Sequence, residues 1–103
     1  MNLDFVAEMV REKKERKEYF NTNLNDDLTK LVNWMKSNDM SEFCTDGVYY
    51  FENERTTYEK ILKKIFEAVM ECVPSNPWNC NYGGCKFTLE RGQGSLYIVE
   101  ILV

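Results

Sequence analysis

The chain has 103 residues, of which 44 % are hydrophobic and 14 % are aromatic, and its formal net charge is -4. This length fits one globular domain over residues 1–103 with a single modest core, and the aromatic content excludes an intrinsically disordered chain. The negative charge is concentrated, because residues 21–54 contain seven acidic and two basic side chains. This distribution argues against direct binding to nucleic acid and favours a partner with a basic surface.

The opening residues lack the basic start of a secretory signal, and Asp4 and Glu8 interrupt their apolar run. No stretch approaches the roughly 20 apolar residues that cross a bilayer. We therefore expect a cytoplasmic protein that does not bind membranes. In a reducing cytoplasm its cysteines default to free thiols.

Apolar residues at helical spacing predict three helices, over residues 3–20, 24–36 and 56–73. The third helix is expected to begin with a capping box made by Thr56 and Glu59. Charged residues of alternating sign fill the second half of the first helix, which is typical of a solvated helix face.

Strand-forming residues lie in two places. The Asp46-Gly47 pair stands between two short β-prone runs and predicts a hairpin over residues 42–51. A second hairpin is expected to pair residues 86–90 with residues 95–103. Residues 75–85, which precede this hairpin, are expected to form a long loop.

The resulting fold class is α+β, with three helices packed on a small antiparallel sheet built from two hairpins, in the order ααββαββ. Residues 95–103 are rich in β-branched and aromatic side chains and are apolar on both faces. A central or doubly covered strand explains this pattern. The same strand could instead join a second copy, so a structural or assembly subunit that forms homo-oligomers through it is the alternative.

The cysteines are the only candidates for chemistry. Cys80 and Cys85 have a spacing at the edge of what zinc loops use, but the chain has no histidine, so Cys44 and Cys72 would have to complete the site. Zinc, a Cys80–Cys85 disulfide and ordinary thiols stay open, and ordinary thiols are favoured. No metal and no cofactor are expected.

Catalysis is not expected either. A cysteine nucleophile needs a neighbouring base, usually histidine, and no glycine motif for nucleotides is present. The carboxylates of residues 21–54 fall in caps and turns, where backbone chemistry explains them.

The candidate partner-binding residues are acids and aromatics. The acids of residues 21–54 could imitate the phosphates that a nucleic-acid-binding protein expects, provided that they converge on one surface. Each aromatic is either an exposed anchor for a partner or a core residue. The candidates are Asp26, Asp27, Asp39, Glu42, Asp46, Glu52, Glu54, Trp34, Trp78 and Tyr82.

These observations predict a small acidic interaction protein, not an enzyme, that binds and inhibits or occludes a macromolecular partner. The expected partner is a protein, for instance a nucleic-acid-binding protein with a basic surface, and a homodimer stays open. Frequent asparagine, lysine and glutamate without histidine suit an AT-rich phage or mobile element. Inhibitors of host defence from such sources are often of this size, which is an association by composition alone.

Overall fold

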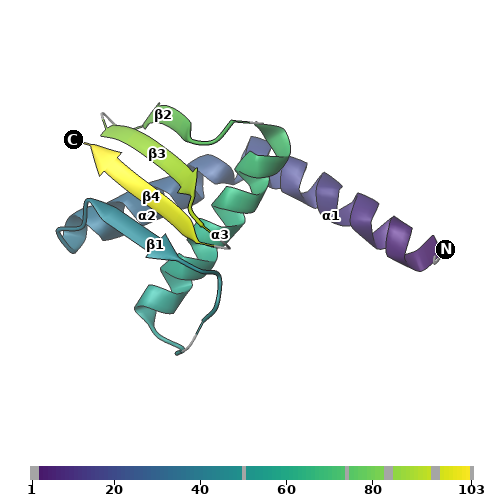
Figure 1. Cartoon of the computed structure of the whole chain (residues 1–103), viewed down its shortest axis with the longest axis horizontal. Coiled ribbons are helices and arrows are strands. Elements are labelled where there is room, and N and C mark those ends of the chain that lie inside the picture. Colours follow the sequence, from purple (N-terminus) through teal and green to yellow (C-terminus); the bar gives the residue numbers. More distant parts are fainter. Residues whose placement is uncertain (1–2, 50, 74, 83–84, 94–95, 103) are drawn as a thin grey trace.

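A computed structural model of the chain describes residues 3–49, 51–73, 75–82, 85–93 and 96–102, without the side chains of Leu3, Tyr82 and Cys85. The structure is α+β, as expected, with three helices and a four-stranded antiparallel sheet (Figure 1). The elements are α1 (Leu3–Thr22), α2 (Leu24–Ser37), β1 (Glu42–Thr45), α3 (Glu54–Cys72), β2 (Trp78–Tyr82), β3 (Cys85–Arg91) and β4 (Tyr97–Leu102).

The strand β4 lies in the middle of the sheet, whose order is β1-β4-β3-β2. Val99 of β4 is opposite Phe43 of β1 on one side and opposite Leu89 of β3 on the other, and all three are buried. The expectation that the last strand is central is confirmed. Burial in the core explains the apolar residues on its inner face, Val99 and Ile101, but not those on its other face, where Leu102 is 56 % exposed.

The strands are distributed along the chain differently from the expected pattern. The prediction of a hairpin over residues 42–51 is wrong for the residues described. The strand β1 pairs with β4, and the described residues that follow β1 form a loop. The amide of Gly47 donates to Thr45 Oγ1 (3.1 Å), the amide of Val48 donates to Asp46 Oδ1 (2.9 Å), and Gly47 has a φ of 81°. This turn leads the chain toward α3 instead of back along β1, and the fourth strand, β2, forms within the expected long loop.

Helix α3 begins at a different cap from the expected one. The side chain of Asn53 accepts a hydrogen bond from the amide of Thr56 (2.9 Å), so Asn53 is the N-cap. Asparagine is among the best residues at this position because its short side chain reaches the free amides of the first turn. Glu59 instead pairs with Arg55 (3.3 Å).

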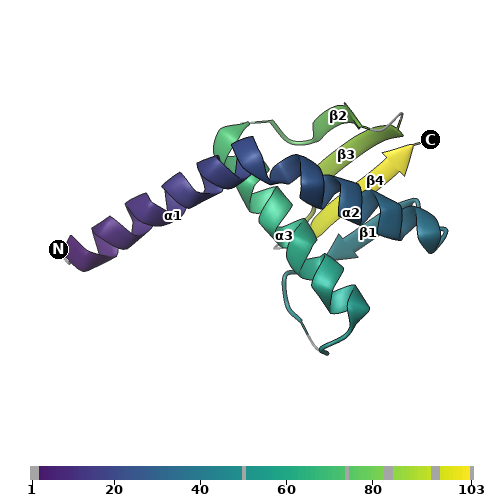
Figure 2. The same ribbon diagram turned by 180° about the vertical axis from the view of Figure 1, so that it is seen from behind.

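The helices α2 and α3 cover one face of the sheet, and the opposite face carries no described helix (Figures 1 and 2). Apolar side chains from both helices and from the inner sheet face form one core. The largest side chains that are fully buried are Leu28, Leu31, Met35, Phe43, Leu62, Ile65, Phe87, Leu89 and Val99.

Trp34 belongs to this core, so its interpretation as an exposed anchor is wrong. It is 9 % exposed, stacks on Tyr58 of α3 with ring centroids 4.3 Å apart, and meets the Phe43 ring edge-on at 5.0 Å. Trp34 lies outside the main apolar stripe of α2 because this helix contacts both α3 and β1. A helix with two neighbours buries more than one stripe.

Only the C-terminal part of α1 packs on the domain. Arg16 and Lys13 pair with Glu71 of α3 at 3.3 Å and 3.5 Å, and Tyr19 and Phe20 join the core. The N-terminal part projects from the body and gives the molecule its longest dimension of 49 Å (Figures 1 and 2). Of the three helices described, none offers an apolar segment of the length that spanning a bilayer requires.

The burial of Trp34 predicts a large effect on stability. We expect Trp34→Ala to lower the free energy of unfolding by about 3–5 kcal/mol, because it removes both aromatic contacts and leaves a cavity. Urea denaturation followed by circular dichroism measures this. Phe51→Ala is the control, since Phe51 is 75 % exposed and should change stability by less than about 0.5 kcal/mol. A loss of less than about 1 kcal/mol for Trp34→Ala would place this residue outside the core.

Candidate functional site

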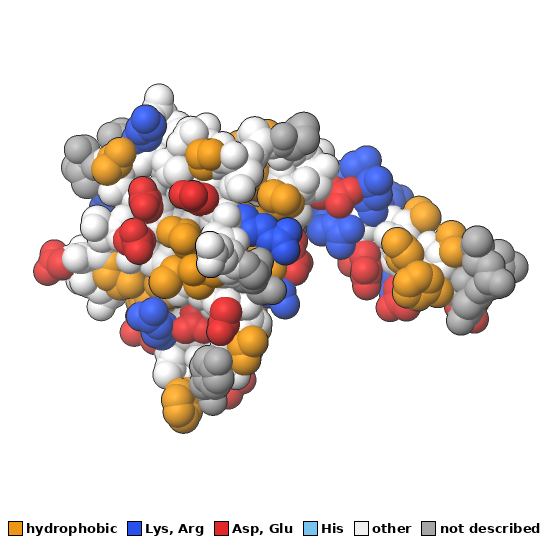
Figure 3. Space-filling view, in the orientation of Figure 1, with side chains coloured by type: hydrophobic (Ala, Val, Ile, Leu, Met, Phe, Trp, Pro, Cys, Tyr) orange, Lys and Arg blue, Asp and Glu red, His pale blue; other side chains and the backbone are white. Residues whose placement is uncertain are grey.

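The candidate site is the face of the sheet that no described helix covers, here called the outer sheet face. Side chains along a strand point alternately to the two faces of the sheet. Those that point to this face are exposed or half-buried. Figure 3 looks onto this face and shows carboxylates and apolar side chains over the strands. The outer sheet face comprises Glu42, Cys44, Asn79, Asn81, Lys86, Thr88, Glu90, Ile98, Glu100 and Leu102.

Three carboxylates lie together on the outer sheet face. Glu42 of β1 is directly opposite Glu100 of β4, and Glu90 of β3 is diagonal to Glu100. Side chains directly opposite each other have their Cβ atoms about 5 Å apart, and like charges in that position repel. Among the residues described, no lysine, arginine or hydrogen-bond donor pairs with any of the three. The structure thus places negative charge here without an intramolecular partner.

Apolar side chains run along β4 beside these acids. Leu96 and Ile98 pack over Gly92, where an added Cβ would stand 3.2 Å and 3.3 Å from them. Further along the strand, Leu102 is 56 % exposed. The outer sheet face therefore combines apolar surface with carboxylates, a mixture that suits a partner with both apolar and basic groups.

The seven acids expected to form a partner site lie at three places in the fold. Asp26 and Asp27 are in the first turn of α2, and Asp39 follows the other end of this helix, about 20 Å away for 14 residues. Glu42 begins β1 close to Asp39 in the chain. The others lie between the end of β1 and the start of α3, and they are Asp46, Glu52 and Glu54. Only Glu42 belongs to the outer sheet face.

Several of these acids have structural partners within the chain. Asp46 accepts the amide of Val48, and Glu52 pairs with Lys60 at 3.6 Å. Asp39 has a φ of 54° and stands just after the end of α2, a conformation that aspartate tolerates better than most residues. Local roles therefore account for much of the acid in residues 21–54.

Asp27 connects two helices. The hydroxyl of Tyr19 on α1 donates a hydrogen bond to Asp27 Oδ2 at 2.5 Å. Burial of the ring, and then the hydrogen bond and negative charge of Asp27, raise the pKa of Tyr19 above its usual range. The phenol stays protonated at every physiological pH, so it keeps donating to Asp27 and holds α1 against the start of α2.

Trp78, the second aromatic candidate, is the first residue of β2 and is half-buried. Its ring meets that of Phe87 edge-on at 6.4 Å and packs against the core, away from the outer sheet face. The side chain of Tyr82 lies outside the described residues. Sequence reasoning missed Glu90 and Glu100. They are identified only by the register of β4 between β1 and β3, which places them near Glu42.

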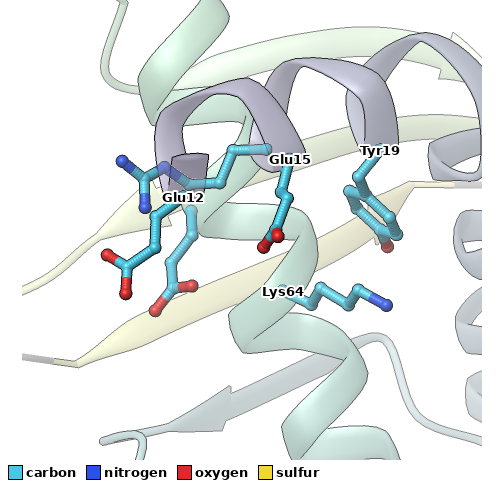
Figure 4. A pocket seen from close by; sticks show the side chains of 6 residues that line it. Glu12, Glu15, Tyr19 and Lys64 are labelled. Atoms are coloured by element: carbon cyan, nitrogen blue, oxygen red, sulfur yellow. The ribbon is translucent and has the colours of Figure 1, made fainter. Parts of the chain in front are cut away.

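A second surface hollow, of about 430 Å³, lies between the helices α1 and α3, apart from the outer sheet face. In Figure 4, Glu12 and Glu15 extend from α1, and Lys64 reaches from α3 toward Tyr19. The Lys64 ammonium lies 4.7 Å from the centre of the Tyr19 ring. The other lining residues are Arg16 and Glu67. The lining is almost entirely charged, whereas small-molecule sites are mostly apolar with few polar groups.

The cysteines that the structure describes are free. Cys44 is exposed on the outer sheet face, whereas Cys72 and Cys80 are half-buried. Burial raises the pKa of the Cys80 thiol. Within the described ranges, no three cysteine or carboxylate side chains come close enough together to hold a metal ion. The side chain of Cys85 lies outside these ranges, so the disulfide with Cys80 stays untested.

Comparison of the chain with protein-family models, with curated proteins and with solved structures finds no match.

The cysteines predict an order of reactivity. We expect iodoacetamide to alkylate Cys44 faster than Cys80 in the native protein, because the raised pKa of Cys80 lowers its thiolate fraction and burial limits access. Mass spectrometry of peptides after timed quenching measures both rates. Unfolding in urea is the control and should bring the two rates together. Equal rates in the native protein would contradict the described packing of Cys80.

Proposed function

We propose that this protein is a small, acidic, non-catalytic interaction protein that binds a macromolecular partner through its outer sheet face and thereby inhibits or occludes it. The observation that supports this most directly is the position of Glu42 opposite Glu100, with Glu90 nearby and no ion pair to any of them among the described residues. The partner that fits is a protein with a basic surface.

The energetics favour this kind of partner. Two glutamates directly opposite each other on a sheet destabilise the free protein, and lysine or arginine side chains of a partner would remove the repulsion on binding. The apolar side chains of Ile98 and Leu102 would lose water in the same step. Charge would then steer the encounter and apolar burial would hold the complex.

A nucleic-acid-binding protein is the partner class we favour. Across the strands, Glu100 lies about 5 Å from Glu42 and about 7–8 Å from Glu90, and these two glutamates stand on either side of β4. Lysine and arginine clusters that bind phosphates accept negative charge at such density. Inhibition of a host defence protein, on behalf of a phage or mobile element, is the setting that the composition suggests.

Strand addition at β4 has less support as a route to homo-oligomers. β1 and β3 occupy the two sides of this strand over the described residues, so an added strand would have to displace one of them. The sheet edges are β1 and β2, and an assembly built by strand addition would use those.

The glutamate pair can be tested without a partner. We expect Glu100→Gln to raise the free energy of unfolding by about 0.2–1 kcal/mol, because it removes the repulsion from Glu42 while keeping the shape of the side chain. Urea denaturation at low ionic strength measures the change, which should shrink in high salt. Glu52→Gln is the control, since Glu52 has a basic partner in Lys60 and should bring no gain. A lower stability for Glu100→Gln would mean that this carboxylate already has a compensating partner in the chain.

Partner binding is tested with two variants of equal charge. E42Q/E90Q/E100Q removes the acids of the outer sheet face, and D26N/E52Q/E54Q removes three acids elsewhere. Proteins retained from a nuclease-treated lysate on the immobilised wild-type chain are identified, purified and titrated against each chain. We expect the first variant to weaken binding by about tenfold or more and the second by less than about twofold.

Competition completes this test. Duplex DNA added to the complex should displace the protein if the partner uses its nucleic-acid-binding surface. Equal weakening by both variants would mean that net charge, and not the position of the acids, controls binding. Unchanged binding by both variants would refute the role of the outer sheet face. Failure of DNA to compete would remove nucleic-acid-binding proteins as the partner class.

A further inference from the structure

The projecting part of α1 exposes apolar side chains along one side of the helix, here called the apolar stripe. The stripe consists of Phe5, Val6, Met9 and Val10, which are between 39 % and 64 % exposed. They account for half of the large hydrophobic side chains that are exposed in the described structure. Apolar side chains are visible on this part of the molecule in Figure 3. A contiguous apolar patch on a globular domain marks an interaction surface.

The apolar stripe continues the side of α1 that packs on α3. Met9 is followed at steps of four, three and four by Lys13, Arg16 and Phe20. Lys13 and Arg16 both pair with Glu71 of α3, and Phe20 packs against the core. Spacings of three and four keep residues on one side of a helix. One side of α1 is therefore covered by a helix over its second half and by none of the described residues over its first half.

The uncovered half has room for another helix beside α3. The centre of the apolar stripe lies about nine residues from the centre of the segment that packs on α3, or roughly 13 Å along the helix axis. Packed helices stand only about 8–10 Å apart. A helix lying next to α3 would therefore reach the apolar stripe without displacing α3.

Carboxylates border the apolar stripe. They follow one another along α1 at steps of four, four and three, and this acidic row consists of Asp4, Glu8, Glu12 and Glu15. Glu12 lies only about 20° from Phe5 around the helix axis, so the row runs beside the Phe5 and Met9 edge of the stripe. Arg11 reaches Glu8 and Glu15 at 3.8 Å and 3.9 Å, in exposed and weak contacts. Glu12 has no ion pair among the described residues.

The hollow between α1 and α3 extends this negative border. Glu12 and Glu15 point from α1 into the hollow (Figure 4), and Glu67 lines it from α3. Glu67 likewise has no ion pair among the residues that the structure describes. The two bases of the lining are engaged elsewhere, since Lys64 lies over the Tyr19 ring and Arg16 pairs with Glu71. A cationic side chain of a partner thus has space and carboxylates to receive it.

We infer that the projecting part of α1 binds an amphipathic helix of a protein partner, whose apolar face is bordered by lysine or arginine. The apolar face of this helix covers the apolar stripe, and its cations lie along the acidic row at Glu8 and Glu12. Apolar burial and charge then act in one interface. This surface is separate from the outer sheet face, and the inference does not depend on that face.

A membrane fits the apolar stripe less well. Interfacial helices carry lysine and arginine around their apolar face, which attract anionic lipids. The stripe is instead bordered by the acidic row, and Lys13, Lys14 and Lys17 lie nearer the body of the domain. The body also lies on the same side of α1 as the stripe, because that side packs on α3. A flat surface would meet the body before it covered the stripe.

A second copy of α1 lacks the matching charge. In a two-fold antiparallel pair of identical helices, each border of one helix faces the same border of the other. Two acidic rows would then meet, and like charges on neighbouring helices repel. A partner helix with a basic border has no such conflict.

Two synthetic peptides test this inference on the full chain. Each is a helix of about 18 residues made of alanine and leucine, with leucine along one face and either lysine or glutamate along its border. Fluorescence anisotropy measures binding of the labelled peptides. We expect the lysine peptide to bind with a dissociation constant in the micromolar range, and the glutamate peptide to bind about tenfold more weakly or less.

Variants of the chain locate the binding. F5Q/M9Q should weaken binding of the lysine peptide by about tenfold or more, because it removes apolar contact area while keeping good helix formers. F51Q is the control, since it removes a large side chain that is 75 % exposed at another site, and it should leave binding unchanged. Circular dichroism confirms that each variant retains its helices.

A charge reversal tests the role of the acidic row. E8K/E12K should exchange the preference, so that the glutamate peptide binds more tightly than the lysine peptide. E52K/E54K changes the net charge of the chain equally at another place and should keep the preference for lysine. An equal shift of preference in both variants would attribute binding to net charge and overturn the inference.

Four further results would overturn it. These are a lysine peptide that does not bind, binding that F5Q/M9Q leaves intact, a dimer in sedimentation equilibrium that F5Q/M9Q dissociates, and binding to phosphatidylcholine–phosphatidylserine vesicles that F5Q/M9Q abolishes. The E42Q/E90Q/E100Q variant should bind the lysine peptide within about twofold of the wild type. Failure of α1 as a docking site is therefore distinguishable from failure of the outer sheet face as a partner site.

Discussion

The pairing of β1 with β4 is the constraint on which the rest of this structure depends. It joins residues more than fifty positions apart, places Phe43 beside Val99 in the core and brings Glu42 opposite Glu100 on the outer sheet face. Because side chains alternate along a strand, a shift of one residue would turn Phe43 to solvent and Glu42 into the core. The burial of Phe43 against Trp34 therefore fixes the same register that assembles the acids. Stability and the candidate binding surface share one cause.

Sequence patterns predicted what depends on neighbours in the chain. The helical periodicity of Leu28, Leu31 and Met35 identifies α2, since a helix face is defined within a few turns. The same local reasoning misassigned the Asp46-Gly47 turn, because a turn signal says that the chain bends and not which strand pairs with β1. Trp34 was ambiguous for a similar reason, as its partners Tyr58 and Phe43 come from distant segments. Glu100 joins Glu42 only through the long-range register, so its place in the candidate site was out of reach of local patterns.

The outer sheet face and the projecting part of α1 differ in what holds them in place. The outer sheet face rests on three ladders of backbone hydrogen bonds and on the core beneath, so its carboxylates are positioned before any partner arrives. The projecting part of α1 is held at one end only, by the hydrogen bond from Tyr19 to Asp27 and by the pairs of Arg16 and Lys13 with Glu71. Few buried contacts support the helix beyond that point, and a helix of this length gains most of its stability from packing. The projecting part of α1 therefore depends mainly on its own helical hydrogen bonds.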